Sequence, residues 1–123
     1  MKSTRLFSIL AVLVLVATSA AAQERRDQFN EHDRQAAREW YRQHHDQRGF
    51  RERDRLTVEQ ERRLQSGQIL DRELYQRAYS VPRDLLRRLP PPPRYFRYMI
   101  VGHHVVLVNR SNRVVRDVIH LHD

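Results

Sequence analysis

The chain has 123 residues, which is enough for one modest domain and too few for two. It contains no cysteine, so neither a disulfide framework nor a thiolate metal site is available to it. The formal net charge at neutral pH is +8, which favours anionic partners, although the arginines are spread along the chain rather than gathered in one patch.

Residues 1–22 have the pattern of a secretory signal peptide. Lys2 and Arg5 precede an apolar run over residues 6–16, and small residues follow up to Ala22. The run of about eleven residues is shorter than the roughly twenty that a membrane-spanning helix needs. We therefore expect cleavage after Ala22 and an exported protein without a transmembrane segment. A retained membrane anchor is the alternative.

Residues 23–55 form a charged segment in which apolar residues are sparse and opposite charges are finely mixed. Such a segment buries little apolar surface to offset the entropy of ordering, although Glu, Arg, Gln and Ala propagate a helix well. We expect a polar N-terminal arm that is either helical or disordered. Phe29, Trp40 and Tyr41 are the large apolar side chains that we expect to dock this arm on the folded part.

The folded domain is expected to cover residues 56–123 and to begin with short helices. The spacing of Thr57 and Gln60 is that of a capping box, which predicts a helix over Val58–Gln65. Gly67 stands where that helix would end in a left-handed turn.

Two further helical segments follow before a run of prolines. Asp71 is the predicted N-cap of the second helix, and Pro82 starts the third. Pro90–Pro93 end all helix and impose an extended spacer. The leucines of these helices are the expected cover of the structure that follows.

After the prolines, the apolar pattern takes the period of two that is typical of β-strands. β-Branched and aromatic residues predict strands at Tyr95–Val101, His104–Asn109 and Arg113–Leu121. Gly102-His103 and Ser111-Asn112 separate the strands and suit tight two-residue turns. The sequence therefore predicts an α+β fold, with short helices covering one apolar face of a three-stranded antiparallel β-meander.

Four of the seven histidines lie in the C-terminal stretch 101–123, which contains most of the predicted meander. Two-residue turns place His104 opposite Ile119. His103 then lies opposite His120, and His122 shares the face of His120 because side chains alternate along a strand. We expect His103, His120 and His122 to bind a first-row divalent metal ion, with His104 on the opposite face. Solvated histidines at strand ends, without a ligand, are the alternative.

No catalytic signature is present. Ser66, Ser80 and Ser111 lack a nucleophile-elbow context, and a chain with three glycines has no glycine-rich phosphate loop. The export signal and the lack of aromatic residues interleaved with a basic strip argue against nucleic-acid binding. We therefore expect a non-enzymatic protein that does not bind nucleic acid.

Three segments between Leu64 and Ile119 stand in a familiar order: LQSGQIL, LLRRLPPPPRYFRYMIVG and HHVVLVNRSNRVVRDVI. The most specific parts are the run Leu89–Pro93, Gly102 after an aromatic-rich strand, and Asp117–Ile119. This order resembles the C-terminal domain of the RcnB family, small exported proteins of Gram-negative bacteria linked to nickel and cobalt homeostasis, and the related CigR-like proteins. The resemblance carries no ligand motif, so the three predicted histidine ligands rest on their spacing.

The resemblance implies a periplasmic, non-enzymatic protein with a role in nickel and cobalt homeostasis, exercised by binding the metal or a transport partner. We then expect no tightly bound cofactor, Ni²⁺ or Co²⁺ as ligand, and an affinity that falls as the pH drops through the histidine range near about 6.5. The alternative is a structural or adaptor module whose arginine-rich surface binds an anionic envelope component or an acidic protein. The sequence leaves the metal, the partner and the oligomeric state open.

Overall fold

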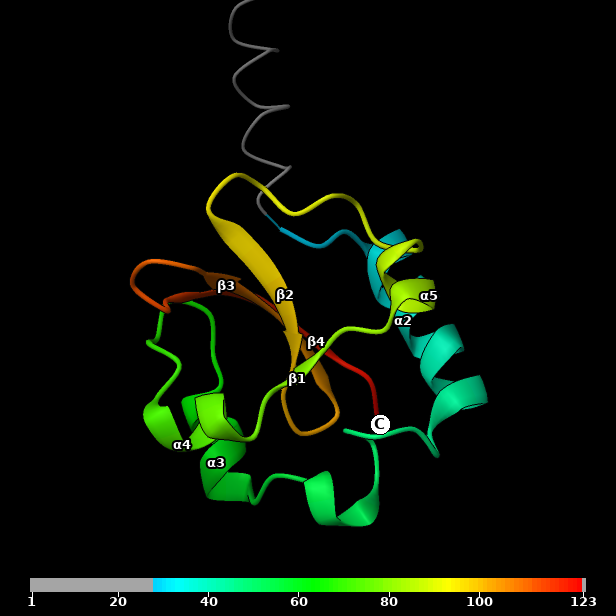
Figure 1. The fold of residues 1–123 in the computed structure, drawn as a ribbon, viewed down its shortest axis with the longest axis horizontal. Coiled ribbons are helices and arrows are strands. Elements are labelled where there is room, and N and C mark those ends of the chain that lie inside the picture. The colour runs from blue at the N-terminus through cyan, green and yellow to red at the C-terminus, as the bar shows by residue number, and fades with distance from the viewer. Residues whose placement is uncertain (1–27, 123) are drawn as a thin grey trace, which may run out of the picture.

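The computed structural model describes residues 28–122, and the predicted signal peptide at residues 1–22 lies outside this range. The predicted α+β class is confirmed. Short helices accompany an antiparallel sheet whose strands follow the order β1-β2-β3-β4 (Figure 1). Within the described range, every helix is too short or too polar to cross a membrane.

Three of the strands are those that the alternating pattern predicts. β2 covers Phe96–Ile100, β3 covers His104–Asn109 and β4 covers Val115–His120. β1 at Tyr79–Ser80 pairs antiparallel with β2 and adds a fourth strand to the predicted three. A strand of two residues is too short to show an alternation, so the sequence pattern does not reveal β1.

The first helix of the predicted domain is α3 at Val58–Arg63. Its capping box is confirmed: the Gln60 backbone N–H donates to the Thr57 hydroxyl at 3.1 Å, and the Thr57 backbone N–H donates to the Gln60 side chain at 2.9 Å. The predicted end at Gln65 is two residues too late, because Leu64 already has a non-helical ψ of 72°.

The two shorter helices also begin where the sequence predicts. α4 covers Arg72–Gln76, and the Asp71 carboxylate accepts the Leu74 backbone N–H at 2.9 Å. α5 covers Arg83–Leu86 and follows Pro82 directly. The Asp71 cap fixes the start of α4, and the restricted φ of Pro82 favours the start of α5, which has no side-chain cap.

The charged N-terminal segment contains helix α2 at Glu31–His44 and the short 3₁₀ helix η2 at Glu52–Asp54. Asn30 caps α2: its side chain accepts the Asp33 backbone N–H at 2.8 Å, and the Asp33 carboxylate accepts the Asn30 backbone N–H at 3.0 Å. Of the two expectations for this segment, the helical one describes residues 31–44.

The aromatic residues of this segment dock it on the sheet, as predicted. Phe29 and Trp40 are buried in the core, and Tyr41 packs against the same cluster. A polar contact reinforces the docking, because Nη2 of Arg34 lies 3.1 Å from a carboxylate oxygen of Asp117 on β4. Helix α2 is therefore part of the folded structure rather than an appendage to it.

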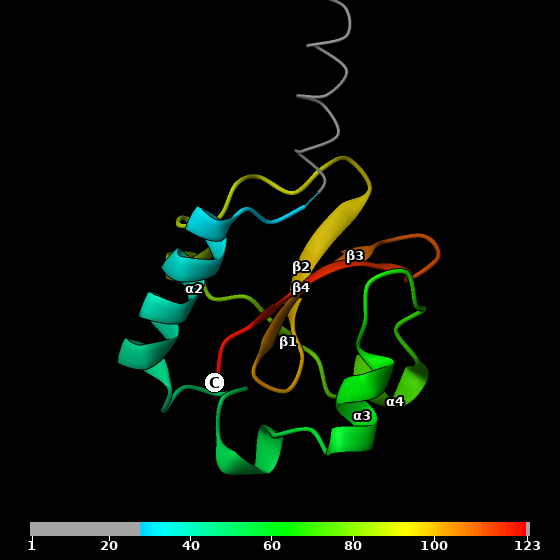
Figure 2. The same ribbon diagram turned by 180° about the vertical axis from the view of Figure 1, so that it is seen from behind.

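Both faces of the sheet are covered, which corrects the prediction of one covered face. On one face, Val105 packs with Trp40 of α2 and Leu85 of α5. On the other face, Val106 packs with Leu74 of α4. Figures 1 and 2 show α2 and α5 together on one side of the sheet and α3 and α4 on the other. Strand β3 is consequently buried along nearly its whole length.

The turn between β2 and β3 is the predicted two-residue turn. Val101 and His104 exchange two backbone hydrogen bonds, each of 3.0 Å. Gly102 and His103 between them both have positive φ, 47° and 63°. This conformation matches the twist of the flanking strands, and His103 adopts it without being glycine.

The connection between β3 and β4 is longer than predicted. The Asn109 backbone N–H donates to the Val114 carbonyl at 3.0 Å, so the loop comprises the four residues Arg110–Arg113 rather than two. The Asn109 side chain accepts the backbone N–H groups of Ser111 at 2.8 Å and Asn112 at 3.2 Å. The side-chain carbonyl oxygen of Asn109 thus stabilises the loop by accepting two of its backbone N–H groups.

A β-bulge at Arg116 changes the register of β4. Val108 lies opposite Val115, as the predicted pairing has it, but Leu107 lies opposite Asp117. Arg116 is the extra residue between these two pairs. Every residue of β4 after the bulge is therefore displaced by one position from the predicted register.

The bulge is held by a segment that lies far away in the sequence. The Ser66 hydroxyl donates to the Arg116 carbonyl at 2.6 Å. The Gly67 N–H donates to the Val115 carbonyl at 2.7 Å, and the Val115 N–H donates to the Gln68 carbonyl at 2.8 Å. These partners satisfy the backbone groups that the bulge takes out of the β3–β4 ladder.

Candidate metal centre

The displaced register brings a different set of histidines together from the predicted one. His104 lies opposite His120, where the predicted register has Ile119. The His104 ring centroid lies 4.8 Å from that of His120 and 5.3 Å from that of His122. Because the rings of His120 and His122 both lie beside the His104 ring, the prediction that His104 lies on the opposite face is wrong. A slip of one residue exchanges the two faces of a strand.

Helix α3 contributes an acidic residue, Glu61, to the same place. Its approach depends on Gly102 in the β2–β3 turn. A Cβ added to Gly102 would lie 2.2 Å from Cγ of Leu56, so the glycine allows Leu56 to pack directly on the turn. Because Leu56 stands immediately before the capped start of α3, this contact holds the helix beside the strand end that carries His104.

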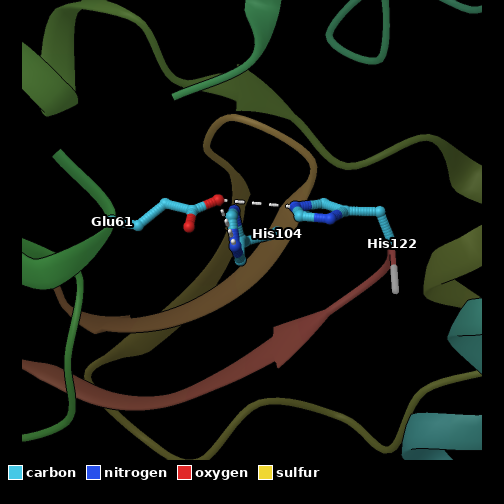
Figure 3. Close-up of side chains that lie close together, drawn as sticks. All are labelled: Glu61, His104 and His122. Atoms are coloured by element: carbon cyan, nitrogen blue, oxygen red, sulfur yellow. Dashed lines mark ion pairs between the residues drawn. The ribbon is translucent and has the colours of Figure 1, made fainter. Parts of the chain in front are cut away.

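The three side chains converge on one point, as Figure 3 shows. Oε1 of Glu61 lies 3.8 Å from Nε2 of His104 and 3.5 Å from Nε2 of His122. All three donor atoms lie within 4.8 Å of one another. Donors around a tetrahedral zinc ion with bonds of about 2.0–2.1 Å are separated by roughly 3.4 Å. Closing inward by about an ångström would therefore give bonding distances.

His104 is held in the form that binds metals. Its side chain is 1% exposed, and its Nδ1 lies 3.1 Å from the Val101 carbonyl. A carbonyl oxygen only accepts, so Nδ1 carries the proton and Nε2 presents a lone pair. Within residues 28–122, this Nε2 has no hydrogen-bond partner. Burial, and secondarily the charge of His120, lowers the pKa of His104 to about 4.

The other members of the cluster are closer to solvent. The side chain of Glu61 is 36% exposed and that of His122 is 27% exposed. Glu61 and His120 line an open cavity of about 260 Å³ next to Ser66 and Asp117. Burial lowers the pKa of His120 as well. The cluster thus has a buried neutral imidazole at its base and a carboxylate that solvent reaches.

His103 belongs to the other layer of the protein. Its Nε2 donates to the Arg51 carbonyl at 2.9 Å, and its Nδ1 accepts from the Tyr41 hydroxyl at 2.7 Å. Burial raises the pKa of Tyr41, so the hydroxyl keeps the proton that it donates. Both ring nitrogens of His103 are therefore engaged, one by Tyr41 of α2 and the other by Arg51 at the start of η2.

Of the three predicted ligands, His122 is the one that joins the gathered donor atoms. His120 contacts His104 through its ring, and the His103 ring lies 5.9 Å from that of His122. The metal role of the predicted three stays a prediction. No sequence signal points to Glu61, because this residue lies on a separate helix and no spacing rule relates it to a strand end far along the chain.

Comparison with solved structures relates this fold to a bacterial envelope protein. The chain is similar to the C-terminal domain of inner membrane protein CigR from Salmonella enterica, with a TM-score of 0.57 and 26% sequence identity. The similarity covers 70% of this chain and 81% of that one. The CigR-like fold that the sequence resemblance implies is thereby supported. No protein-family model and no curated protein matches the sequence.

Proposed function

We propose that this protein is exported, is associated with the bacterial envelope, and binds a divalent first-row metal ion at Glu61, His104 and His122 without catalysing a reaction. Ni²⁺ and Co²⁺ are the ions that the RcnB-like sequence pattern implies, and their homeostasis is the implied process. The observation that carries the proposal is the buried Nε2 lone pair of His104, which faces the Glu61 carboxylate 3.8 Å away.

The buried Nε2 of His104 has no hydrogen-bond partner among residues 28–122, and it faces a second acceptor, the partly exposed Glu61 carboxylate, so a proton or a cation between the two would stabilise both. A proton on His104 would serve, but the pKa of about 4 leaves this ring neutral near neutral pH. A metal ion would satisfy the His104 lone pair and the Glu61 charge together, and His122 would supply a third donor. The bond from His104 Nδ1 to the Val101 carbonyl already fixes the required tautomer.

The donor set suits the proposed ions. Imidazole nitrogen binds nickel, zinc, copper and iron well, and the chain has no thiolate to divert the site toward softer metals. Three protein donors leave coordination positions open for water or for a ligand from a partner, unlike the closed four-ligand sites of structural zinc. Open positions suit a protein that captures an ion and hands it over.

Two observations support a location in the envelope. Residues 1–22 have the composition of an export signal. The similar solved domain is described as part of an inner membrane protein. Both fit a protein that meets metal ions outside the cytoplasm.

Calorimetric titration of the metal-free protein with Ni²⁺, Co²⁺ and Zn²⁺ tests the proposal. We expect one ion bound per chain. Glu61→Gln should weaken binding at least about tenfold, whereas Glu59→Gln, on the exposed part of the same helix, should not change it. If Glu61→Gln and Glu59→Gln bound the metal ion with equal affinity, Glu61 would not be a ligand and the proposed site would be wrong.

Histidine variants distinguish this site from the one predicted by spacing. His122→Gln should weaken binding strongly, and the exposed His45→Gln is its control. His120→Gln should have little effect if Glu61, His104 and His122 hold the ion. A loss of binding with His120→Gln and none with Glu61→Gln would favour the predicted set of His103, His120 and His122 instead.

A further inference from the structure

A second candidate site lies on the same face of the sheet as His104, at the other end of β3. An open cavity of about 300 Å³ is found there. Its lining residues come from α4, β2, β3 and the β3–β4 loop: Tyr75, Arg97, Val108, Asn109, Arg110 and Arg113. None of the described residues that line it is acidic.

Tyr75 organises two of the arginines. Nη2 of Arg97 donates to the Tyr75 hydroxyl at 3.0 Å. The guanidinium of Arg113 lies 4.1 Å from the centroid of the Tyr75 ring. The negative face of the ring and the hydroxyl lone pair offset the mutual repulsion of the two cations. Two guanidinium groups are thus held beside one cavity before any ligand arrives.

The positive charge at this cavity is not neutralised by the protein. Among residues 28–122, no carboxylate forms an ion pair with Arg97, Arg110 or Arg113. The acidic residues nearest to Tyr75 in the sequence, Asp71 and Glu73, are paired with Arg63 of α3 instead. Three cations around one recess therefore attract an anion of more than one charge.

We propose that this cavity binds a phosphoryl group. A phosphate monoester carries a charge of about −1.5 to −2 at neutral pH and three acceptor oxygens, which match several guanidinium donors. A carboxylate would neutralise one arginine only. The Tyr75 hydroxyl accepts its bond from Arg97 with a lone pair, so its own proton can donate to a phosphate oxygen.

The phosphoryl group could be that of free phosphate or of a lipid head group, and two measurements separate these sources. Titration of the protein with inorganic phosphate, at low ionic strength and with a chelator to exclude the metal site, should give saturable binding. Sedimentation with phosphatidylcholine vesicles that do or do not contain phosphatidic acid then tests the head group. Binding in the titration alone points to free phosphate, and binding in both points to the lipid.

The variants for this test are chosen to keep the fold. Arg110→Gln changes an exposed loop side chain and should weaken phosphate binding about tenfold. Arg97→Gln should do the same by removing the donor to Tyr75. Arg88→Gln removes the same charge from an exposed position outside the cavity and should change binding less than about twofold. Equal losses in all three variants, or no saturable binding of phosphate to the unmodified protein, would overturn the proposal.

Discussion

Nε2 of His104 lies 3.8 Å from Oε1 of Glu61, and near neutral pH the His104 imidazole has no proton on Nε2 to donate to this oxygen. The distance fits an ion pair, yet burial keeps the imidazole neutral, so the two groups face each other as a lone pair and a negative charge. A cation between the two groups would bind the lone pair of His104 and balance the charge of Glu61. The proposed metal site and the pH behaviour of the fold both follow from this pair.

Acid should destabilise the fold through His104. Its pKa is about 4 in the folded protein, against about 6.5 when unfolded, so the unfolded chain binds more protons between these values. Stability is therefore lost as the pH falls from about 6.5 to 4, by about 3 kcal/mol from this residue. Urea unfolding of wild type and His104→Gln near pH 7 and near pH 4 checks this. Between pH 7 and pH 4, the free energy of unfolding should fall by about 3 kcal/mol less in His104→Gln than in wild type. Equal decreases in the two proteins would contradict the assignment of this loss to His104.

A bound metal ion should stabilise the folded chain. An ion that binds only the folded state adds about 2.7 kcal/mol when its concentration is one hundred times Kd. For a domain of this size, that raises Tm by roughly 10 °C or more. Thermal unfolding with and without Ni²⁺ measures the shift, and a chelator should reverse it. Glu61→Gln should show little of the shift, and a full shift in that variant would place the stabilising ion elsewhere.

Replacing Gly102 with alanine should damage the fold and the site together. The new Cβ would lie 2.2 Å from Cγ of Leu56, at a residue whose φ is 47°. Gly67→Ala is the matched control, because Gly67 has a φ of 90° but no heavy atom within 4 Å of the added Cβ. The control isolates the backbone strain of about 1 kcal/mol. In urea unfolding, Gly102→Ala should lower the free energy of unfolding by about 1–3 kcal/mol more than Gly67→Ala does. Gly102→Ala should also weaken metal binding.

The attachment of α2 should depend on Asp117. Its carboxylate accepts the Phe29 N–H at 2.9 Å and lies within 3.2 Å of Nη2 of Arg34, whose side chain is 26% exposed. Asp117→Asn leaves that guanidinium without its counter-charge, so we expect a loss of about 1–3 kcal/mol. Hydrogen exchange should become faster in Glu31–His44. Asp46→Asn, at a side chain that is 96% exposed, should change neither quantity.

Local signals determined much of the fold. Thr57 with Gln60 and Asp71 cap the helices that the sequence predicts, because a cap needs only a side chain and a backbone N–H three residues away. The turn at Gly102 and His103 and the strand over His104–Asn109 also follow from neighbouring residues, through positive φ and β-branched composition. Nothing about these features requires knowledge of the rest of the chain.

Tertiary structure alone decided which side chains meet. The bulge at Arg116 depends on the Ser66 hydroxyl, which comes from fifty residues earlier, and it moves His120 from the predicted partner to His104. Glu61 reaches the same point because Leu56 packs on Gly102. A period of two cannot encode an inserted residue whose backbone groups are satisfied by a distant segment. The sequence therefore predicted strands rich in histidine, and long-range contacts selected the ones that face Glu61.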